Sequence, residues 1–423
     1  MILPLVAGLA AMGLASAQTP SSDLPPPPGT LERELSLSPE SGTPPPAAQG
    51  GALNLANAVE IPFVLEDGHI IVQASIDGNP PMPFMFDTGA RDIITPEVAR
   101  TLNTTEVRSA RIGGFGRQVS LADMVKVGQI TIGDATLEDQ VVSVLDIPNT
   151  LADRGARPRL AGFIGSELLA HYAVSIDYGR HTLILNNPGF YPSRATFSLP
   201  LDFAMSPEGL ALPSVTAELD GAAGDFVIDT GGGTQVFVSQ QFEQEHNPFA
   251  QYGKVLNFLS AGGIGGRAYV HLGFGKQLRL GPVTLSPPVV AGTTDMRGQG
   301  FSAGVLGAGI LSQFIVTIDY QSSRAYFETI AGRKLPTILH GTGMEYDKPD
   351  HEAFEVLDVL PGSAAEQAGL QRGDRIVEVG GQPARDLSTS DVGHLSVFPA
   401  HKSLAVRTSD GRRFDLAIRQ ILP

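Results

Sequence analysis

The sequence predicts a mainly β protein made of two similar halves and a smaller C-terminal module. Its 423 residues include 49 glycines and 32 prolines but only 17% charged residues, and short alternating segments are separated by turns, a balance typical of β proteins. The halves share repeated motifs, and a different pattern begins near residue 340. A chain of this length is expected to form two or three domains, each with its own core.

Charge and cysteine content exclude several classes of function. The chain has 29 Lys and Arg residues against 44 Asp and Glu residues, for a formal net charge of −15. An acidic surface repels nucleic acids and anionic membrane surfaces, so we expect neither as a partner. Cysteine is absent, which excludes disulfides, thiolate catalysis, Fe–S clusters and zinc sites built on cysteine. We expect no metal and no other cofactor.

The N-terminus has the features of an export signal. Residues 2–17 carry no charge and end in Ala-Ser-Ala, the small-x-small pattern of signal peptidase sites, although no basic n-region is seen. Residues 1–17 are therefore predicted to be a signal peptide, with a buried first strand as the alternative. The run is shorter than the roughly 20 residues that a membrane span needs. We expect a periplasmic or secreted protein without a membrane span, in which Pro-rich residues 18–51 form a disordered linker.

The central region contains an internal duplication. The segment FMFDTG at 84–89 returns as FVIDTG at 226–231, and VSIDY at 174–178 returns as VTIDY at 316–320. Both repeats are offset by 142 positions. Two motifs that share one offset indicate two structurally equivalent units.

We assign these units to residues 52–195 and 196–332. In each, an alternating segment precedes the Asp-Thr-Gly triplet and is predicted to be one arm of a hairpin, at 69–76 in the first unit and 214–219 in the second.

Short helices and Gly-rich turns are predicted after the triplets. Thr95 and Ser239 are suitable helix caps. The Gly-rich segments IGGFG at 112–116 and GGIGG at 262–266 lie between alternating segments, as hairpin tips do. A phosphate-binding loop is the weaker alternative, because no Lys-Ser/Thr pair follows within a strand-to-helix pattern.

The two triplets suggest a specific chemistry. If the halves pack about a pseudo-twofold axis, Asp87 and Asp229 face each other, and two carboxylates about 3 Å apart share one proton instead of both ionising. One then acts as a general base on a water molecule while the other protonates a peptide carbonyl, so an amide can be hydrolysed without a metal or a covalent intermediate. Asp177 and Asp319 end strands before turns and are expected to be structural.

The residues beside each Asp are expected to support this arrangement. The hydroxyls of Thr88 and Thr230 are predicted to hydrogen-bond across the axis. Gly89 and Gly231 leave room for the carboxylates and offer backbone N–H donors.

With these motifs, the halves resemble the pepsin and retropepsin superfamily of aspartic proteases over about residues 58–330. The shared elements are an apolar run, Asp-Thr-Gly, a flap hairpin and a later apolar-apolar-Gly element, here at 163–165 and 305–307. The resemblance implies a bilobal β-barrel pseudo-dimer in which Asp87 and Asp229 are the catalytic dyad. With both triplets in one chain, a monomer suffices.

The resemblance also places the flaps and shows where this chain departs from the family. The flap candidates are Gly114, Phe115 and Gly116 in the first half and Gly263, Ile264 and Gly265 in the second. Pepsin-like enzymes usually have Ser or Thr after the first triplet and a flap Tyr, whereas this chain has Ala90 and Phe115. Ala90 is closer to the retroviral pattern, which implies activity at weakly acidic to near-neutral pH.

The C-terminal module, assigned to residues 338–421, has a different pattern. FEVLDV at 354–359 alternates like a strand, and SAAE at 363–366 is a capping box for a short helix that Gly369 ends. The pattern PGSAA, AGL and GDRI resembles a PDZ domain of the bacterial protease-associated type, a small α+β fold.

Such a PDZ domain implies binding of peptide C-termini. The peptide would add as a strand to a sheet edge, with its carboxylate held by backbone N–H groups. The residues at this loop are Gly341, Thr342, Gly343 and Met344. Thr342 replaces a usual large apolar residue and Pro349 lies in the expected next strand, so ligand binding is a weaker expectation than the fold.

Several functions compete on these observations. The first is an exported aspartic endopeptidase that acts on proteins or peptides, with the PDZ domain tethering substrates or regulating activity. The alternative is a non-catalytic peptide-binding adaptor that retains both folds. A serine protease, which often accompanies PDZ modules of this type, ranks below both. Zinc hydrolysis also ranks low, because the nine histidines are scattered without a His-Glu-x-x-His motif, and His271 is expected on the surface or in a loop.

Overall fold

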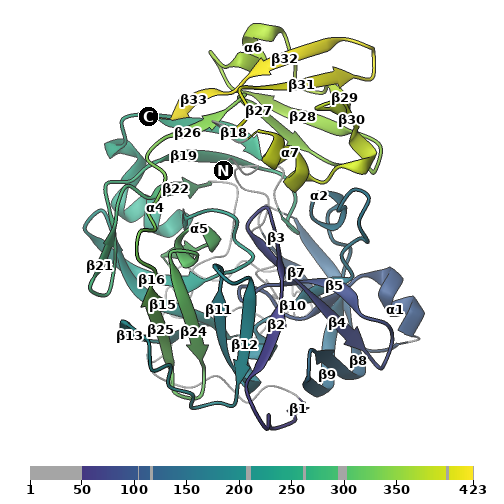
Figure 1. Cartoon of the computed structure of the whole chain (residues 1–423), viewed down its shortest axis with the longest axis vertical. Coiled ribbons are helices and arrows are strands. Elements are labelled where there is room, and N and C mark those ends of the chain that lie inside the picture. Colours follow the sequence, from purple (N-terminus) through teal and green to yellow (C-terminus); the bar gives the residue numbers. More distant parts are fainter. Residues whose placement is uncertain are drawn as a thin grey trace, which may run out of the picture.

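The protein forms two β lobes joined by a shared sheet, with a smaller domain at one end (Figure 1). This computed structural model describes residues 50–102, 104–114, 118–205, 211–260, 263–293, 303–396 and 400–422. The predicted signal peptide and nearly all of the predicted linker lie outside the described residues. The mainly β fold class is confirmed.

The first lobe is a nine-stranded sheet in the order β1-β9-β6-β10-β5-β4-β8-β7, with β3 paired to β4. Its strands are β1 (Gly51–Ala52), β3 (Val64–Glu66), β4 (His69–Ile76), β5 (Met82–Phe86), β6 (Ile93–Ile94), β7 (Thr105–Gly113), β8 (Val119–Ile132), β9 (Ala135–Val144) and β10 (Gly162–Ile164). Its helices are α1 (Pro96–Leu102), α2 (Asn149–Ala152) and α3 (Glu167–His171).

The second lobe repeats this plan in a ten-stranded sheet, β18-β19-β22-β17-β23-β16-β15-β20-β21, with β14 paired to β15. Its strands are β14 (Asp202–Met205), β15 (Ala211–Leu219), β16 (Ala222–Ile228), β17 (Val236–Val238), β18 (Val255–Ser260), β19 (Ala268–Phe274), β20 (Leu278–Leu280), β21 (Val283–Leu285), β22 (Val289–Gly292) and β23 (Gly304–Leu306). Its helices are α4 (Gln240–His246), the 3-10 helix η1 (Pro248–Gln251) and α5 (Ala308–Leu311). The helices α1 and α4 therefore follow the two triplets, as the caps predicted.

A six-stranded sheet, β13-β25-β24-β11-β12-β2, joins the lobes. Its strands are β2 (Val59–Pro62), β11 (Ala173–Asp177), β12 (Thr182–Asn186), β13 (Phe197–Pro200), β24 (Phe314–Asp319) and β25 (Arg324–Thr329). The duplicated VSIDY and VTIDY segments lie antiparallel at its centre, where Ser175 pairs with its own equivalent, Thr317, and their hydroxyls are 2.7 Å apart. In an antiparallel pair this register places the pseudo-twofold axis between these two residues.

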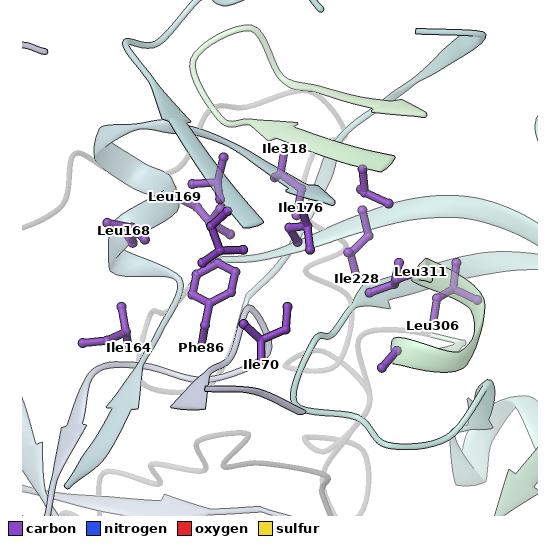
Figure 2. Close-up of a cluster of buried hydrophobic side chains, with 14 of the residues drawn as sticks. Ile70, Phe86, Ile164, Leu168, Leu169, Ile176, Ile228, Leu306, Leu311 and Ile318 are labelled. Carbon is purple, nitrogen blue, oxygen red and sulfur yellow. The ribbon is translucent and has the colours of Figure 1, made fainter. Parts of the chain in front are cut away.

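One apolar core extends beneath both lobes (Figure 2). Phe86 and Ile164 reach it from the first lobe, Ile228 and Leu306 from the second, and Ile176 from the joining sheet, all with at most 1% exposure. A fully buried side chain of this size contributes about 1.5–3 kcal/mol, so this core stabilises the strands that end at the two triplets.

The C-terminal domain contains the sheet β27-β28-β29-β31-β32, with β30 paired to β29, and a separate pair, β26-β33. Its strands are β26 (Leu339–Gly341), β27 (Met344–Asp347), β28 (Phe354–Val359), β29 (Arg375–Val379), β30 (Gln382–Pro383), β31 (Ser403–Thr408), β32 (Arg413–Ala417) and β33 (Arg419–Leu422). Its helices are α6 (Ala364–Ala368), η2 (Ala384–Asp386) and α7 (Thr389–Leu395).

The helix ends of this domain follow its sequence signals. Ser363 accepts a hydrogen bond from the Glu366 backbone N–H, and Gly369 ends α6 with a φ of 86°. The predicted capping box at α6 is incomplete, because the Glu366 carboxylate accepts from the Gly362 N–H and not from that of Ser363. A complete capping box, Ser388 with Asp391, opens α7 and was not predicted. In the parts of the chain with described coordinates, no helix combines the length and apolar character that crossing a membrane requires.

Candidate active site

The two Asp-Thr-Gly loops meet at the centre of the molecule. Asp87 follows β5 and its backbone N–H donates to Ile164 of β10, while Asp229 follows β16 and donates in the same way to Leu306 of β23. A Cβ atom added to Gly89 would lie 2.6 Å from Cγ of Asp229, so each triplet lies directly against the carboxyl group of the other. Both aspartates have 0% exposure.

The two threonines connect the loops reciprocally. The Thr88 backbone N–H donates to Thr230 Oγ1 at 3.0 Å, and the Thr230 N–H donates to Thr88 Oγ1 at 3.0 Å. Each hydroxyl also donates to a carbonyl of the opposite strand, Thr88 to Ile228 at 2.6 Å and Thr230 to Phe86 at 2.8 Å. Because every one of these bonds crosses between the lobes, the relative position of the carboxyl groups is set by backbone and hydroxyl geometry.

Backbone donors hold one oxygen of each carboxyl group. Gly89 N–H donates to Asp87 Oδ1 at 2.9 Å, while Gly231 and Gly232 donate to Asp229 Oδ1 at 2.8 and 3.0 Å. The buried Oδ2 atoms accept no hydrogen bond from a third residue within the described residues. These two oxygens are therefore the ones available to a reacting molecule.

The environment raises the pKa of both aspartates. Burial, the charge of Asp229 and a hydrogen bond shared with it raise the pKa of Asp87 well above its usual value. Burial also raises the pKa of Asp229, against the opposing hydrogen bonds at its carboxyl group. Burial and like charge thus favour a pair that retains one proton, which supplies an acid and a base at the same place.

A buried polar group that sequence reasoning missed supports the first triplet. Asp92 Oδ1 accepts from Gly165 N–H at 2.7 Å, and Glu167 Oε2 accepts from the Asp92 N–H at 2.9 Å. Arg91 lies 3.8 Å from Glu167. These contacts fasten the β10–α3 turn to the triplet loop. Only the nearness of Arg91 and Asp92 to the triplet could have indicated this role.

His69 makes a second contact that the sequence did not indicate. It begins β4 of the first lobe, has 3% exposure, and its Nε2 lies 3.1 Å from the carbonyl oxygen of Gly231 in the second lobe. The alternating sequence pattern predicted the strand that His69 begins, but not its contact with the second lobe.

The tips of the two predicted flap hairpins meet each other. The first is β7–β8, with Gly114 at its tip, and the second is β18–β19, whose tip contains Gly263, Ile264 and Gly265. The Gln118 N–H donates to the Gly265 carbonyl at 2.9 Å, so the tips meet. Phe115 and Gly116 lie outside the described residues.

Apolar packing holds the flaps down. Ile264 and Ile112 belong to one buried cluster with Ala90, Leu151 and Phe163. This cluster, which we call the cleft cluster, fills the space between the flaps and the first lobe. Because both aspartates are buried in this arrangement, a substrate can reach them only after part of the surrounding structure moves.

Two other observations bear on alternative chemistries. His271 lies in strand β19, stacks edge-on against Phe249 and contacts Glu243 at 2.8 Å, so it is a partly exposed strand residue and not a loop residue. The segment GFSAG at 300–304 matches Gly-x-Ser-x-Gly, but Gly304 opens strand β23, whereas the serine nucleophile motif joins a strand to a helix. Among the residues with described positions, no three His, Asp or Glu side chains are grouped to hold a metal.

The predicted PDZ carboxylate loop is the turn between two strands of the C-terminal domain. Gly341 ends β26, Met344 begins β27, and Thr342 and Gly343 form the turn between them. Pro349 lies beyond β27, which ends at Asp347, so it does not interrupt the strand.

Comparisons with known proteins identify two kinds of domain in this chain. Residues 72–168 match the aspartyl protease family model, and residues 355–395 match the PDZ domain model. A Ralstonia nicotianae protein whose name describes it as a putative zinc metalloprotease is 28% identical over 141 residues, which are 32% of this chain and 29% of that protein. The match thus spans less than a third of that relative's length. By the two family matches, the chain combines an aspartyl protease domain with a C-terminal PDZ domain.

Proposed function

We propose that this protein is an aspartic endopeptidase that hydrolyses peptide bonds of proteins or peptides with Asp87 and Asp229 as its catalytic residues. The observation that carries the proposal is the reciprocal joining of the two Asp-Thr-Gly loops, which holds two buried carboxyl groups with raised pKa values against each other.

In this mechanism the ionised carboxylate takes a proton from a water molecule held between the Oδ2 atoms. The water oxygen attacks the peptide carbonyl carbon while the protonated carboxyl group donates its proton to the carbonyl oxygen, which forms a neutral tetrahedral diol. The carboxyl group that took the water proton then donates it to the amide nitrogen, while the other carboxylate, now ionised, takes back a proton from one hydroxyl of the diol. The C–N bond breaks, one product leaves as an amine and the other as a carboxylic acid, and the pair of aspartates again holds one proton. The glycine N–H groups at Oδ1 keep the carboxyl groups oriented throughout.

The name of the Ralstonia relative raises zinc hydrolysis as another chemistry. No His-Glu-x-x-His motif occurs in the sequence, whereas two Asp-Thr-Gly triplets do. The aspartic mechanism therefore accounts for more of what this chain contains.

The buried dyad favours one second candidate, a non-catalytic peptide-binding adaptor, because both aspartates have 0% exposure. We further propose that the protein is exported to the periplasm or secreted, since residues 1–17 have a signal-peptide pattern, and that it acts as a monomer.

The test is cleavage of an unfolded protein mixture between pH 4 and 8, with and without pepstatin, which mimics the tetrahedral intermediate. Asp87→Asn and Asp229→Asn should each abolish cleavage while the circular dichroism spectrum is unchanged. Asp225→Asn is the matched control, because this exposed residue lies in β16, the strand that leads to Asp229, and its carboxylate accepts a hydrogen bond from Thr216 on the protein surface. Peptide binding without cleavage at any pH would favour the adaptor, and cleavage that survives both dyad variants would refute the proposal.

A further inference from the structure

The PDZ domain contacts the protease directly, because α2 of the first lobe binds the edge of the PDZ sheet. β27 is the terminal strand of the PDZ sheet. Both backbone groups of Lys348, the residue after β27, are taken by α2. The Lys348 N–H donates to Thr150 Oγ1 at 3.2 Å, and the Lys348 carbonyl accepts from Asn149 Nδ2 at 2.9 Å. Asn149 and Thr150 thus satisfy a backbone N–H and C=O as an added strand would.

The same segment reaches the helix on the other side of the groove. A PDZ peptide groove lies between the edge strand that follows the carboxylate loop and a helix, here β27 and α7. Tyr346 of β27 donates to the carbonyl of Thr389, which begins α7. The Thr389 hydroxyl contacts the Thr150 carbonyl at 3.5 Å and Asp67 of the first lobe at 2.6 Å. The α2 segment therefore closes the end of the groove opposite the carboxylate loop.

That loop has the form expected of a carboxylate site. The Thr342 carbonyl accepts from the Ala365 N–H of α6, and the Gly343 carbonyl accepts from the Leu360 N–H just before that helix. Because the peptide unit between Thr342 and Gly343 is trans, the Gly343 N–H points away from α6, opposite to the Thr342 carbonyl. A peptide could place its carboxylate here, but its upstream residues, running along β27, would meet Asn149 and Thr150.

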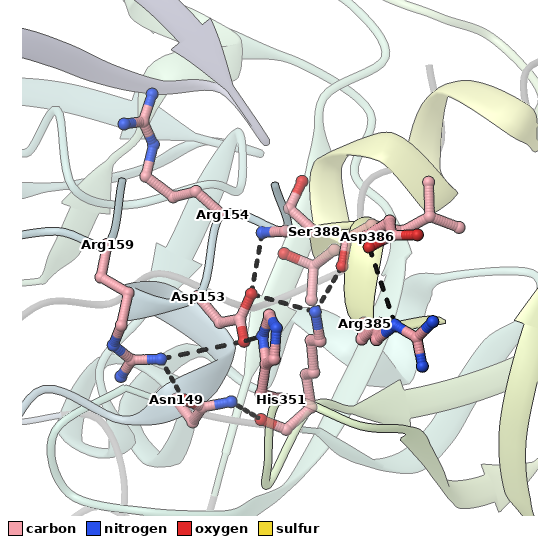
Figure 3. A network of polar contacts seen from close by, with 12 residues as sticks. Asn149, Asp153, Arg154, Arg159, His351, Arg385, Asp386 and Ser388 are labelled. Carbon is pink, nitrogen blue, oxygen red and sulfur yellow. Dashed lines mark hydrogen bonds and ion pairs between the residues drawn. The ribbon is translucent and has the colours of Figure 1, made fainter. Parts of the chain in front are cut away.

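An ion-pair network stabilises the closed groove (Figure 3). Lys348, with 0% side-chain exposure, lies 3.0 Å from Asp153 at the end of α2, and Asp153 also contacts His351 at 2.8 Å. Beside it, Arg157 bonds both Glu66 and Asp391. These contacts are specific to the present arrangement of the PDZ domain on the first lobe.

One PDZ residue links this segment to the second flap. Asp347 Oδ1 accepts from the Thr150 hydroxyl, and Asp347 Oδ2 accepts from Arg267 Nε at 2.9 Å. Arg267 directly follows the flap tip and also pairs with Glu355 of β28 at 2.8 Å. The adjacent flap strand bonds the PDZ sheet as well, from Leu259 N–H to Asp358 at 3.0 Å.

On its other side, α2 packs into the protease. Leu151 and Ala152 are members of the cleft cluster that holds Ile112 and Ile264 of the flaps. One short helix thus touches both the PDZ groove and the packing that keeps the flaps shut.

We propose that the PDZ groove is occupied in cis by Asn149 and Thr150, and that a peptide with a free C-terminal carboxylate displaces them and thereby releases the flaps. The peptide is an activator of the protease in this scheme, and this second step rests on the proposed function. The apparent affinity for the peptide is lowered by the fraction of molecules whose groove is closed. Weakening the α2 contacts should therefore tighten peptide binding and raise basal cleavage.

The binding step is tested in the full chain carrying Asp87→Asn, so that no peptide is cleaved. The probes are fluorescein-labelled decapeptides that differ only in the last residue, one for each amino acid, each with a free or an amidated C-terminus. Asn149→Ala with Thr150→Val should bind the best free-carboxylate peptide at least about tenfold more tightly, since three side-chain hydrogen bonds that close the groove are lost. Asn187→Ala with Thr196→Val is the matched control, because these residues make comparable backbone contacts far from the groove. If the double variant fails to fold, Asn149→Ala alone serves as the milder change.

The proposal would be overturned if the double variant and the chain without these two substitutions bound the peptide with equal affinity, or if neither bound it. It would also be overturned if amidated peptides bound as tightly as those with a free carboxylate. For the coupling, the same peptide should accelerate cleavage of a fluorogenic protein substrate by the otherwise unmodified chain, and less so in the variant, whose basal rate is already higher. Tighter binding with no change of cleavage rate would refute the coupling. Absence of all cleavage, with the difference in peptide binding retained, would refute the proposed function but not the occupied groove.

Discussion

Replacing Lys348 with Met is expected to destabilise the protein by about 3 kcal/mol. The Lys348 side chain has 0% exposure and its partner, Asp153, has 1%. Although burial alone would raise it, the pKa of Asp153 is held below its usual value by hydrogen bonds from His351, Gly155 and Lys348, so Asp153 is ionised. Removing one member of a buried pair costs about 3–5 kcal/mol because the other charge stays buried. The lower end applies here, since His351 and Gly155 still bond Asp153.

The assay is urea unfolding of the full chain, monitored by far-UV circular dichroism because the sequence contains no tryptophan for fluorescence. Asp153→Asn combined with Lys348→Met should recover more than half of the lost stability, because neither charge is then buried. Lys126→Met is the matched control: its pair with Asp139 is more than half exposed and should be worth at most about 1 kcal/mol. Unchanged stability of Lys348→Met, or a double variant as unstable as the sum of the single ones, would refute the reasoning.

The remaining predictions concern the site and its pH dependence. Thr88→Val leaves the Thr230 N–H without its acceptor and should cost about 1–3 kcal/mol, together with a fall in kcat, measured by unfolding and by cleavage. Gly231→Ala should abolish cleavage, since its Cβ would overlap the Asp87 carboxyl group, while the far-UV spectrum stays the same. Burial, with the charge of Asp358, raises the pKa of Glu345 from 4.5 to about 8. The folded protein thus holds a proton that the unfolded chain releases, so stability should fall as pH rises from about 4.5 to 8, and Glu345→Gln should flatten this part of the profile.

The repeated motifs predicted more of the site than of its surroundings. The offset of 142 placed Asp87 and Asp229 in equivalent positions, and the structure brings their loops together. The glycine-rich turns were predicted as hairpin tips, and their meeting through Gln118 and Gly265 could not be, because a contact between two distant hairpins leaves no local pattern. For the same reason, the sequence did not predict that Asp92 bonds Gly165 beside the first triplet or that His69 contacts Gly231.

The C-terminal domain shows the same division. Its strand alternation and helix caps are local signals, and they predicted an α+β PDZ domain without reference to the rest of the chain. The side chains that attach it, such as Thr150, Arg267 and Lys348, are ordinary polar residues in the sequence. Only their positions in space show that they belong to one interface.

By itself, the sequence determined the duplication, the two carboxylates with their Thr and Gly neighbours, and the kind of domain that follows. These properties depend on residue type, period and spacing, which act over a few positions along the chain. The tertiary structure alone decided that the flap tips meet, that α2 closes the end of the PDZ groove, and that Asp347 joins α2 to a flap. Such contacts arise from the packing of surfaces that are hundreds of residues apart, and their free energy depends on burial and distance, neither of which is written in the order of the residues.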